Sequence, residues 1–200
     1  MRNIKLILEY DGTSYHGWQK QPEIPTVQNF LENSLFCLFQ RKTKVIAAGR
    51  TDAGVHAKGQ VVNFTTDASV PLSAIKPALN SYLPKDIRVK RVKEVSLDFH
   101  AQKSALSRLY RYIIHAGSFL SPFYRHFVWW IPFNLDPDKI RRASQFLIGE
   151  HDFSSFEGEG SPSLSSRRKI EKITLLKKRG FIIIYIRADS FLYKMARNIV

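Results

Sequence analysis

The sequence predicts an α+β protein made of two related halves with mainly antiparallel sheets. In residues 1–103, segments with strand and helix periodicity follow the order βαββαβ. Residues 104–200 begin the same order again but stop at βαββα. The complete order is the split βαβ, or ferredoxin-like, arrangement. We therefore expect two domains, 1–103 and 104–200.

The first three elements follow from hydrophobic spacing and one capping residue. Residues 4–10 form a strand, because apolar side chains occupy every second position. Thr26 is a typical N-cap, and apolar residues then recur at helical spacing as far as Leu38. Residues 45–48 are a short strand.

The next three elements complete the first half. Residues 60–64 read as a strand, and residues 87–92 alternate cleanly as another. Between them we expect a helix over 72–82, although Pro77 lacks the N–H that a helix interior needs.

The second half repeats the pattern without its last strand. Asp136 and Pro137 are a cap and a first-turn proline, and Gly149 is a typical helix stop. The expected elements, in chain order, are a strand over 105–115, a helix over 136–149, strands over 169–176 and 181–188, and a helix from about Phe191. We expect that a terminal strand of this half is missing from the chain.

Two segments outside these elements have a distinctive composition. Residues 127–133 contain Trp129 and Trp130, and we expect them to be buried between a strand and a helix; stacking on RNA is the alternative. Residues 157–166 are rich in Gly and Ser and precede three basic residues. We expect this segment to be a flexible loop near an anionic ligand.

The charge balance is strongly basic. Thirty-one Lys and Arg against 17 Asp and Glu give a formal net charge of +14. A polyanionic partner, above all a nucleic acid, explains such a balance. A basic surface kept only for solubility is the alternative.

Cysteine number and apolar run length exclude several protein classes. Cys37 is the single cysteine, so an internal disulfide and a cysteine-based zinc site are excluded. The longest apolar run, residues 181–186, is far too short for a spanning helix. The N-terminus lacks the continuous apolar centre of a signal peptide. We therefore expect a cytoplasmic protein with no membrane partner.

Residues 48–56, Ala-Gly-Arg-Thr-Asp-Ala-Gly-Val-His, form the densest group of reactive side chains. Glycines on both sides of Arg50, Thr51 and Asp52 allow a sharp turn and a close approach to a ligand. An Asp two residues from an Arg can be oriented by charge-assisted hydrogen bonds and act as nucleophile or base. An ordinary turn stabilised by the Asp side chain is the alternative.

Residues 49–56, the signature loop, resemble the signature of the TruA family of tRNA pseudouridine synthases. Residues 10–19, the opening segment (Tyr-Asp-Gly-Thr-Ser-Tyr-His-Gly-Trp-Gln), resemble the opening motif of that family. Further matches follow in family order at residues 26–28, 59–61, 83–87, 99–101, 110–112, 149–156 and 195–200. One departure is Gln102, where the family often has Arg.

The resemblance implies isomerisation of uridine to pseudouridine at positions 38–40 of the tRNA anticodon arm. It implies a homodimer that needs no cofactor and no metal. The catalytic aspartate of the family falls on Asp52 and its partner arginine on Arg50. Tyr110 takes the place of the tyrosine that stacks on the target base, and Arg197 that of a substrate-binding arginine. Residues 1–103 then carry the catalytic loop, and residues 104–200 contribute to the RNA cleft.

The residue types suit this chemistry. The N1–C1′ bond must break, uracil must rotate, and C5 must join C1′. A carboxylate can add to the base or the sugar, or remove the C2′ proton, and the sequence leaves these routes open. The uridine must be flipped out of its stack, and an aromatic ring such as Tyr110 can replace the lost stacking.

Basic residues and histidines supply further candidates. The six histidines are scattered, without metal-ligand spacing, and His56 of the signature loop is a candidate substrate contact. We expect phosphate contacts, and hence salt-sensitive binding, from basic side chains of the second half. These are Arg108, Arg111, Arg167, Arg168, Lys169, Lys177, Lys178 and Arg179.

Two other function classes compete with the isomerase. A noncatalytic RNA-binding module explains the charge and the fold, because split βαβ sheets commonly bind RNA. It does not explain Arg-Thr-Asp between glycines. An Asp-dependent phosphotransferase or nuclease would need a second acidic cluster to share a metal with Asp52, and none is evident.

Overall fold

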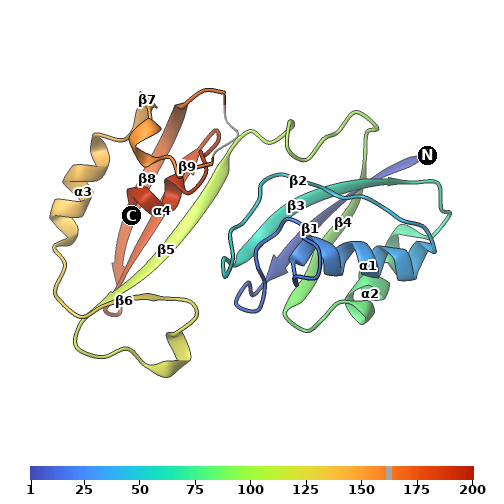
Figure 1. The fold of residues 1–200 in the computed structure, drawn as a ribbon, viewed down its shortest axis with the longest axis horizontal. Coiled ribbons are helices and arrows are strands. Elements are labelled where there is room, and N and C mark those ends of the chain that lie inside the picture. Colours follow the sequence, from blue (N-terminus) through green and yellow to red (C-terminus); the bar gives the residue numbers. More distant parts are fainter. Residues whose placement is uncertain (161–163) are drawn as a thin grey trace. The chain divides into compact units, whose positions relative to one another are not determined.

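The structure is a computed structural model that describes residues 1–160 and 164–200. The chain divides into two compact units, Met1–Ala105 and Leu106–Val200, each with its own sheet and helices (Figure 1). Residues 161–163, within the segment expected to be a flexible loop, lie outside the described residues.

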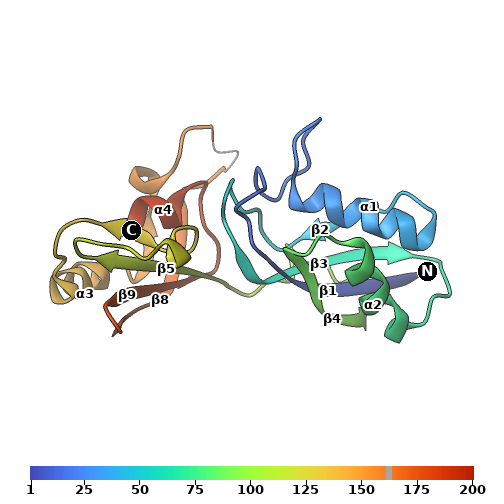
Figure 2. The ribbon, with the colours of Figure 1, turned by 90° about the horizontal axis from the view of Figure 1, so that it is seen from below.

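The first unit contains a four-stranded antiparallel sheet with strand order β2-β3-β1-β4. Two helices, α1 and α2, lie together on one face of this sheet (Figure 2). The elements in chain order are β1 (Arg2–Tyr10), α1 (Val27–Phe39), β2 (Ile46–Ala47), β3 (Ala57–Thr66), α2 (Leu72–Tyr82) and β4 (Ile87–Val95).

The strand β1 shows how the sequence determines this layer. Ile4, Leu6 and Leu8 are fully buried against the helices, while Lys5 and Ile7 between them lie on the opposite, open face. This arrangement follows from the period of two in a strand. The first unit therefore has a single core between its sheet and its helices, and an open sheet face.

The second unit contains a five-stranded sheet with strand order β6-β5-β9-β8-β7. The pairing of β5 with β6 is parallel, and the other pairings are antiparallel. The elements in chain order are β5 (Arg108–Ala116), the 3-10 helix η1 (Pro122–Tyr124), β6 (Trp129–Ile131), α3 (Pro137–Gln145), β7 (Gly149–Asp152), the 3-10 helix η2 (Ser154–Phe156), β8 (Arg167–Lys178), β9 (Phe181–Ala188) and α4 (Met195–Ile199).

The core of the second unit lies on one face of its sheet. Ile182, Ile184 and Ile186 of β9 are buried at alternate positions. Ile140 of α3 and Met195 of α4 pack against this cluster. The predicted α+β class with two sheets of mainly antiparallel strands is confirmed.

The order of elements in the second unit differs from the predicted βαββα, because β6 and β7 were not expected. Gly149, expected to end a helix, instead begins β7, and α3 ends four residues earlier at Gln145. β7 reads Gly-Glu-His-Asp, without the apolar alternation by which a strand is recognised. The last helix also starts later than expected, at Met195.

The tryptophan pair is exposed, so the expectation of a buried segment was wrong. Trp129 and Trp130 are 50% and 43% exposed, whereas Ile131 is buried. All three belong to β6, which is last in the strand order of the described sheet and pairs there with the last residues of β5. A short edge strand has fewer neighbours to cover its side chains.

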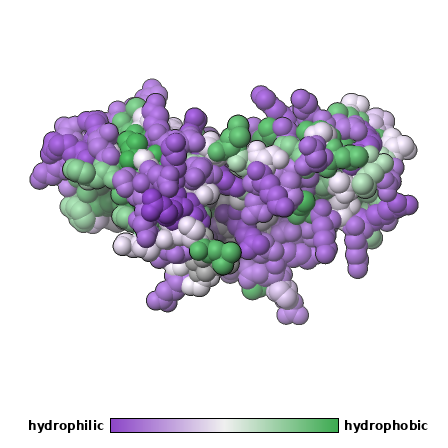
Figure 3. Space-filling view, turned by 90° about the horizontal axis from the view of Figure 1, so that it is seen from above, coloured by the Kyte–Doolittle hydropathy of each residue, from purple (hydrophilic) through white to green (hydrophobic). Residues whose placement is uncertain are grey.

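Hydrophilic residues dominate the face of both units drawn in Figure 3. Among residues 1–160 and 164–200, no helix is both long and apolar enough to cross a lipid bilayer.

Candidate active site

The signature loop connects β2 to β3 and contains a tight turn. The backbone N–H of Val55 donates to the carbonyl of Asp52 at 3.1 Å, closing the turn. Gly54, its third residue, has a φ of 75°, which a glycine adopts without strain. The Asp-Ala-Gly sequence therefore does form a turn, and Asp52 begins it with a partly exposed side chain.

Backbone hydrogen bonds fix the signature loop to the opening segment. Trp18 N–H donates to the Thr51 carbonyl at 2.9 Å, and Gly54 N–H donates to the Tyr15 carbonyl at 3.1 Å. The hydroxyl groups of Tyr10 and Thr51 are 2.8 Å apart. The residues on both sides of Asp52 are thus held by segments distant in the sequence.

Two glycines of the opening segment permit this close packing. A Cβ atom on Gly12 would lie 2.1 Å from the carbonyl oxygen of Val55. A Cβ on Gly17 would lie 2.5 Å from the carbonyl oxygen of Thr51, and Gly17 has a φ of +88°. Only residues without a side chain fit at these two positions.

His56 and Asp11 form a second connection between the loop and the opening segment. The Nδ1 atom of His56 lies 3.0 Å from the backbone nitrogen of Gly12 and 3.0 Å from a carboxylate oxygen of Asp11. The hydroxyl and backbone N–H of Thr13 donate to the same carboxylate. His56, a predicted substrate contact, therefore also holds the opening segment.

Tyr15 connects the opening segment to the start of β4. Its hydroxyl donates to a carboxylate oxygen of Asp86 at 2.5 Å, and its ring contacts Phe30 edge-on. Burial, together with this carboxylate, raises the pKa of Tyr15 well above its usual value. Tyr15 therefore remains a neutral donor at physiological pH.

The expected ion pair between Arg50 and Asp52 is not formed, which corrects the sequence-based prediction. Among the interactions of the described residues, none involves the carboxylate of Asp52 or the guanidinium of Arg50. Arg50 is exposed, and water solvates an exposed guanidinium well enough that an ion pair adds little. The loop positions Asp52 through its backbone; the side chain of Asp52 is partly exposed and that of Arg50 is exposed.

Four candidate residues of the second unit lie on strands at one end of its sheet. Arg108 and Tyr110 lie near the start of β5, and Arg167 and Arg168 at the start of β8. The first residues of β5 and of β8 lie on either side of the end of β9. Ala188 of β9 is the register partner of Arg108 on β5 and of Ile170 on β8. The sheet thus places the backbone positions of four predicted RNA-binding residues at the same end.

Several of these side chains are already engaged. Arg108 donates to the carbonyl of Asp189 at 2.6 Å, and Arg167 pairs with Glu150 at 3.2 Å. The rings of Tyr110 and Phe191 meet edge-on with centroids 4.7 Å apart. Tyr110 therefore has an aromatic neighbour that restrains its orientation.

Arg168 belongs to the Tyr110 end of the sheet, whereas other candidates of the second unit do not. Arg168 donates to backbone carbonyls of residues 165 and 167. Arg197 is exposed on α4. Lys177, Lys178 and Arg179 lie at the opposite end of β8 from Arg167, so the sheet does not bring them to the Tyr110 end.

Sequence reasoning identified the loop and missed its supports. Gly12, Gly17, Tyr15 and Asp86 were not singled out, because the sequence does not show which distant segment they contact. The available signal was that Gly12, Tyr15 and Gly17 lie within the opening segment and Asp86 within the matched residues 83–87. In the part of the chain that the structure describes, no three His, Cys, Asp or Glu side chains are grouped closely enough to hold a metal ion.

Comparison with known proteins places this site in a family. The sequence profile described as tRNA pseudouridine synthase matches residues 6–102 and 143–200. The chain belongs to the tRNA pseudouridine synthase family. The matched residues include the opening segment, the signature loop and β8, β9 and α4, while Arg108 and Tyr110 lie between the two matched regions.

Individual relatives of the family support this assignment over the whole chain. The chain is 44% identical over 200 residues to tRNA pseudouridine synthase A of Acetivibrio thermocellus, covering all of this chain and 82% of the relative. It is 43% identical to the protein of the same name from Thermoanaerobacter sp. (strain X514), again with 82% of the relative covered. It is 44% identical to that from Blochmanniella pennsylvanica, with 77% covered.

The contacts of the Asp11 carboxylate make the stability of the opening segment beside the signature loop dependent on pH. Partial burial raises the pKa of Asp11, but hydrogen bonds from Thr13 and the proximity of His56 outweigh it and lower the pKa. A carboxyl group with a lowered pKa stabilises the fold above its unfolded-state pKa and loses that contribution as pH falls through the folded-state value. We expect the unfolding free energy of the Asp11→Asn variant to fall less steeply below about pH 4 than that of the unaltered protein. Urea denaturation at several pH values measures both slopes. Equal pH slopes for both proteins would contradict this role.

Proposed function

We propose that this protein isomerises uridine to pseudouridine at positions 38–40 of the tRNA anticodon arm, with Asp52 as the catalytic carboxylate. Membership of the tRNA pseudouridine synthase family supports the reaction. The observation that carries the assignment of Asp52 is its partly exposed side chain on a turn held by backbone hydrogen bonds from the opening segment. Such a loop holds a reactive carboxylate in place without using the carboxylate itself in a hydrogen bond.

The reaction rearranges one substrate, so atoms and electrons balance without a co-reactant. The N1–C1′ bond breaks, a C5–C1′ bond forms, and the proton on C5 leaves while N1 gains one. Asp52 assists by adding to the base or the sugar, or by removing the C2′ proton. Each route requires a carboxylate that reaches the nucleotide directly.

The other site residues receive separate roles in this proposal. Arg50, exposed and without an ion pair to Asp52 among the described residues, remains the predicted catalytic partner of Asp52 and acts on the bound nucleotide. Tyr110 stacks on the uracil, and its edge contact with Phe191 supports the orientation of its ring. Arg197, Arg108, Arg167, Arg168 and His56 remain predicted substrate contacts. We further propose a homodimer, which light scattering tests.

The two parts of the chain divide this work. Residues 1–103 carry the catalytic loop, and residues 104–200 supply Tyr110 and the basic side chains of an RNA cleft. Phosphate contacts position an RNA without reading its sequence, which suits the arginines at the end of the second sheet.

The reaction has a direct test. The chain is incubated with unmodified tRNA in the absence of divalent metal and cofactor, and the product is analysed by mass and by carbodiimide derivatisation. We expect a tRNA of unchanged mass that carries derivatised pseudouridine at positions 38–40. Unreacted tRNA would indicate an RNA-binding module, and fragments a nuclease.

Replacing Tyr110 with Phe separates stacking from proton transfer. The ring remains, so we expect tRNA affinity to stay within about twofold. We propose that the Tyr110 hydroxyl also takes part in removing the C5 proton, so its loss should lower turnover about 100-fold. Tyr185→Phe is the matched control, because Tyr185 pairs with Arg111 on the opposite face of the same sheet. Normal turnover of the Tyr110 variant would limit this residue to stacking.

A further inference from the structure

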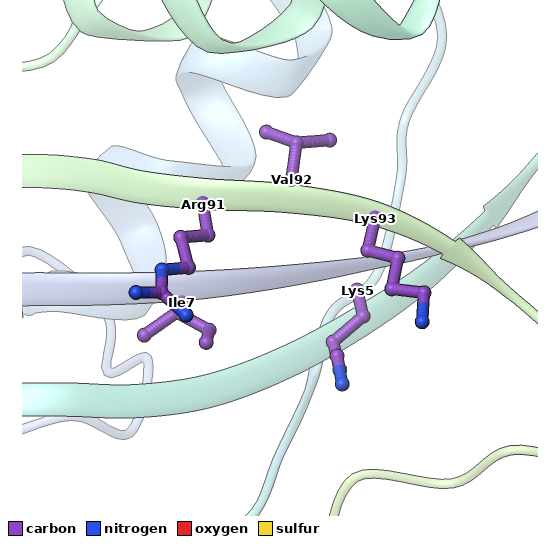
Figure 4. A pocket seen from close by; sticks show the side chains of 5 residues that line it. All are labelled: Lys5, Ile7, Arg91, Val92 and Lys93. Atoms are coloured by element: carbon purple, nitrogen blue, oxygen red, sulfur yellow. The ribbon is translucent and has the colours of Figure 1, made fainter.

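The open face of the first sheet carries a depression of about 360 Å³ on the side opposite α1 and α2 (Figure 4). It is lined by Lys5 and Ile7 of β1 and by Arg91, Val92 and Lys93 of β4. The side chains of Lys5, Arg91 and Lys93 extend from this face, away from the helices. We call these three cations the basic face.

The basic face brings like charges together across a strand pair. Lys5 is the register partner of Lys93, and Ile7 that of Arg91. Like charges directly opposite each other on neighbouring strands destabilise a sheet. An arrangement that costs stability in the free protein is explained by an anionic ligand that neutralises it.

Nearby carboxylates do not neutralise the basic face. Glu9 pairs with Lys90 at 2.9 Å, and Glu94 pairs with Arg2 at 2.8 Å. Among the described residues, no carboxylate forms an ion pair with a cation of the basic face. The ammonium group of Lys5 lies 5.5 Å from the centroid of the Phe99 ring, a contact that leaves its charge in place.

Protection of an exposed strand edge does not account for the whole arrangement. β4 is an edge strand, and lysines on edge strands discourage pairing with other chains. Lys5, however, belongs to β1, which has β3 on one side and β4 on the other. A cation on a central strand contributes nothing to edge protection, so the face as a whole requires another explanation.

We propose that the basic face binds phosphate groups of the tRNA outside the reacting nucleotide. This inference rests on the proposed function, which supplies a tRNA as the polyanion. β1 leads from Lys5 to Tyr10, whose hydroxyl contacts Thr51 beside Asp52. Five residues of extended strand span about 17 Å. Tyr10 is buried on the helix side of the sheet, so a tRNA arm bound at Asp52 reaches the basic face by passing the end of the strands.

The test compares two variants that each lose three positive charges. The first, Lys5→Gln, Arg91→Gln and Lys93→Gln, removes the basic face. The control, Arg41→Gln, Lys42→Gln and Lys44→Gln, removes three exposed cations between α1 and β2. Affinity for unmodified tRNA is measured by filter binding over a range of salt concentrations, and thermal unfolding checks that each variant is folded.

We expect the basic-face variant to bind tRNA at least 10-fold more weakly near 0.1 M salt. Its plot of log affinity against log salt should be shallower by about 2 to 3, because each lost phosphate contact reduces the slope by nearly one. In the pseudouridine assay the loss should appear in KM. The control should retain the slope of the unaltered chain, and relief of repulsion should leave the melting temperature of the basic-face variant equal or higher.

The possible outcomes separate this inference from the proposed function. Unchanged tRNA binding by the basic-face variant, or an equal loss in the control, would overturn the inference while pseudouridine formation could still be observed. An altered oligomeric state with unchanged tRNA affinity would assign the face to a second copy of the chain and also overturn it. Absence of pseudouridine from the unaltered chain would refute the proposed function, whereas the binding comparison would still decide the role of the basic face.

Discussion

Asp52→Asn is expected to reduce pseudouridine formation at least about a thousandfold while leaving tRNA affinity nearly unchanged. The substitution preserves size and shape but removes the nucleophilic and basic carboxylate. Because the backbone of the signature loop holds this position, and the Asp52 side chain forms no hydrogen bond or ion pair with the described residues, the fold should be unaffected. Release of tritium from C5-labelled tRNA measures turnover, and filter binding measures affinity.

Asp98→Asn is the matched control for this substitution. It changes the net charge by the same amount in the same unit, on an exposed residue between β4 and β5. We expect it to retain the turnover of the unaltered chain. If Asp52→Asn kept more than about a tenth of the turnover, Asp52 would not be the catalytic carboxylate.

Gly12→Ala is expected to have the second largest effect, although residue 12 contacts no substrate in the proposed mechanism. Its Cβ would lie 2.1 Å from the Val55 carbonyl oxygen, so either the opening segment or the signature loop must shift. We expect the unfolding free energy to fall by about 1–3 kcal/mol. A displacement near 1 Å at Asp52 should lower turnover by about 100-fold. Urea denaturation and single-turnover kinetics measure the two effects.

Gly59→Ala provides the control for the glycine substitution. Gly59 lies in β3, and nothing is within 4 Å of the position of an added Cβ. We expect unchanged turnover and a stability that is equal or higher by up to about 1 kcal/mol, since alanine has the lower entropy cost in a strand. Similar losses in the two variants would show that steric contact with the signature loop is not the cause.

Elements with strong periodicity were predictable from the sequence, and short polar ones were not. In the first unit, the expected strand over 4–10 is part of β1, and the expected helix over 72–82 has the bounds of α2. These elements each bury one face in a shared core, so the pattern of apolar residues reports them. β6 and β7 exist through hydrogen bonds to neighbouring strands, which local sequence does not report.

The candidate site shows the same limit at the level of side chains. The composition of the signature loop indicated a turn with a reactive carboxylate, and the structure contains that turn. The predicted pairing of Arg50 with Asp52 relied on their proximity in the chain. Because the Arg50 guanidinium is solvated by water, an ion pair with Asp52 would add little stability. The contacts of Gly12 and Tyr15 depend on which segments the fold brings together.

The link from Tyr15 to Asp86 has a consequence for synthesis of the chain on the ribosome. A nascent polypeptide that ends before Asp86 already contains Asp52. It lacks, however, the carboxylate that accepts the hydrogen bond from Tyr15 of the opening segment. The reactive group therefore acquires its final position only after translation has passed residue 86. We expect incomplete chains released earlier, which carry the loop without its full framework, to form no pseudouridine.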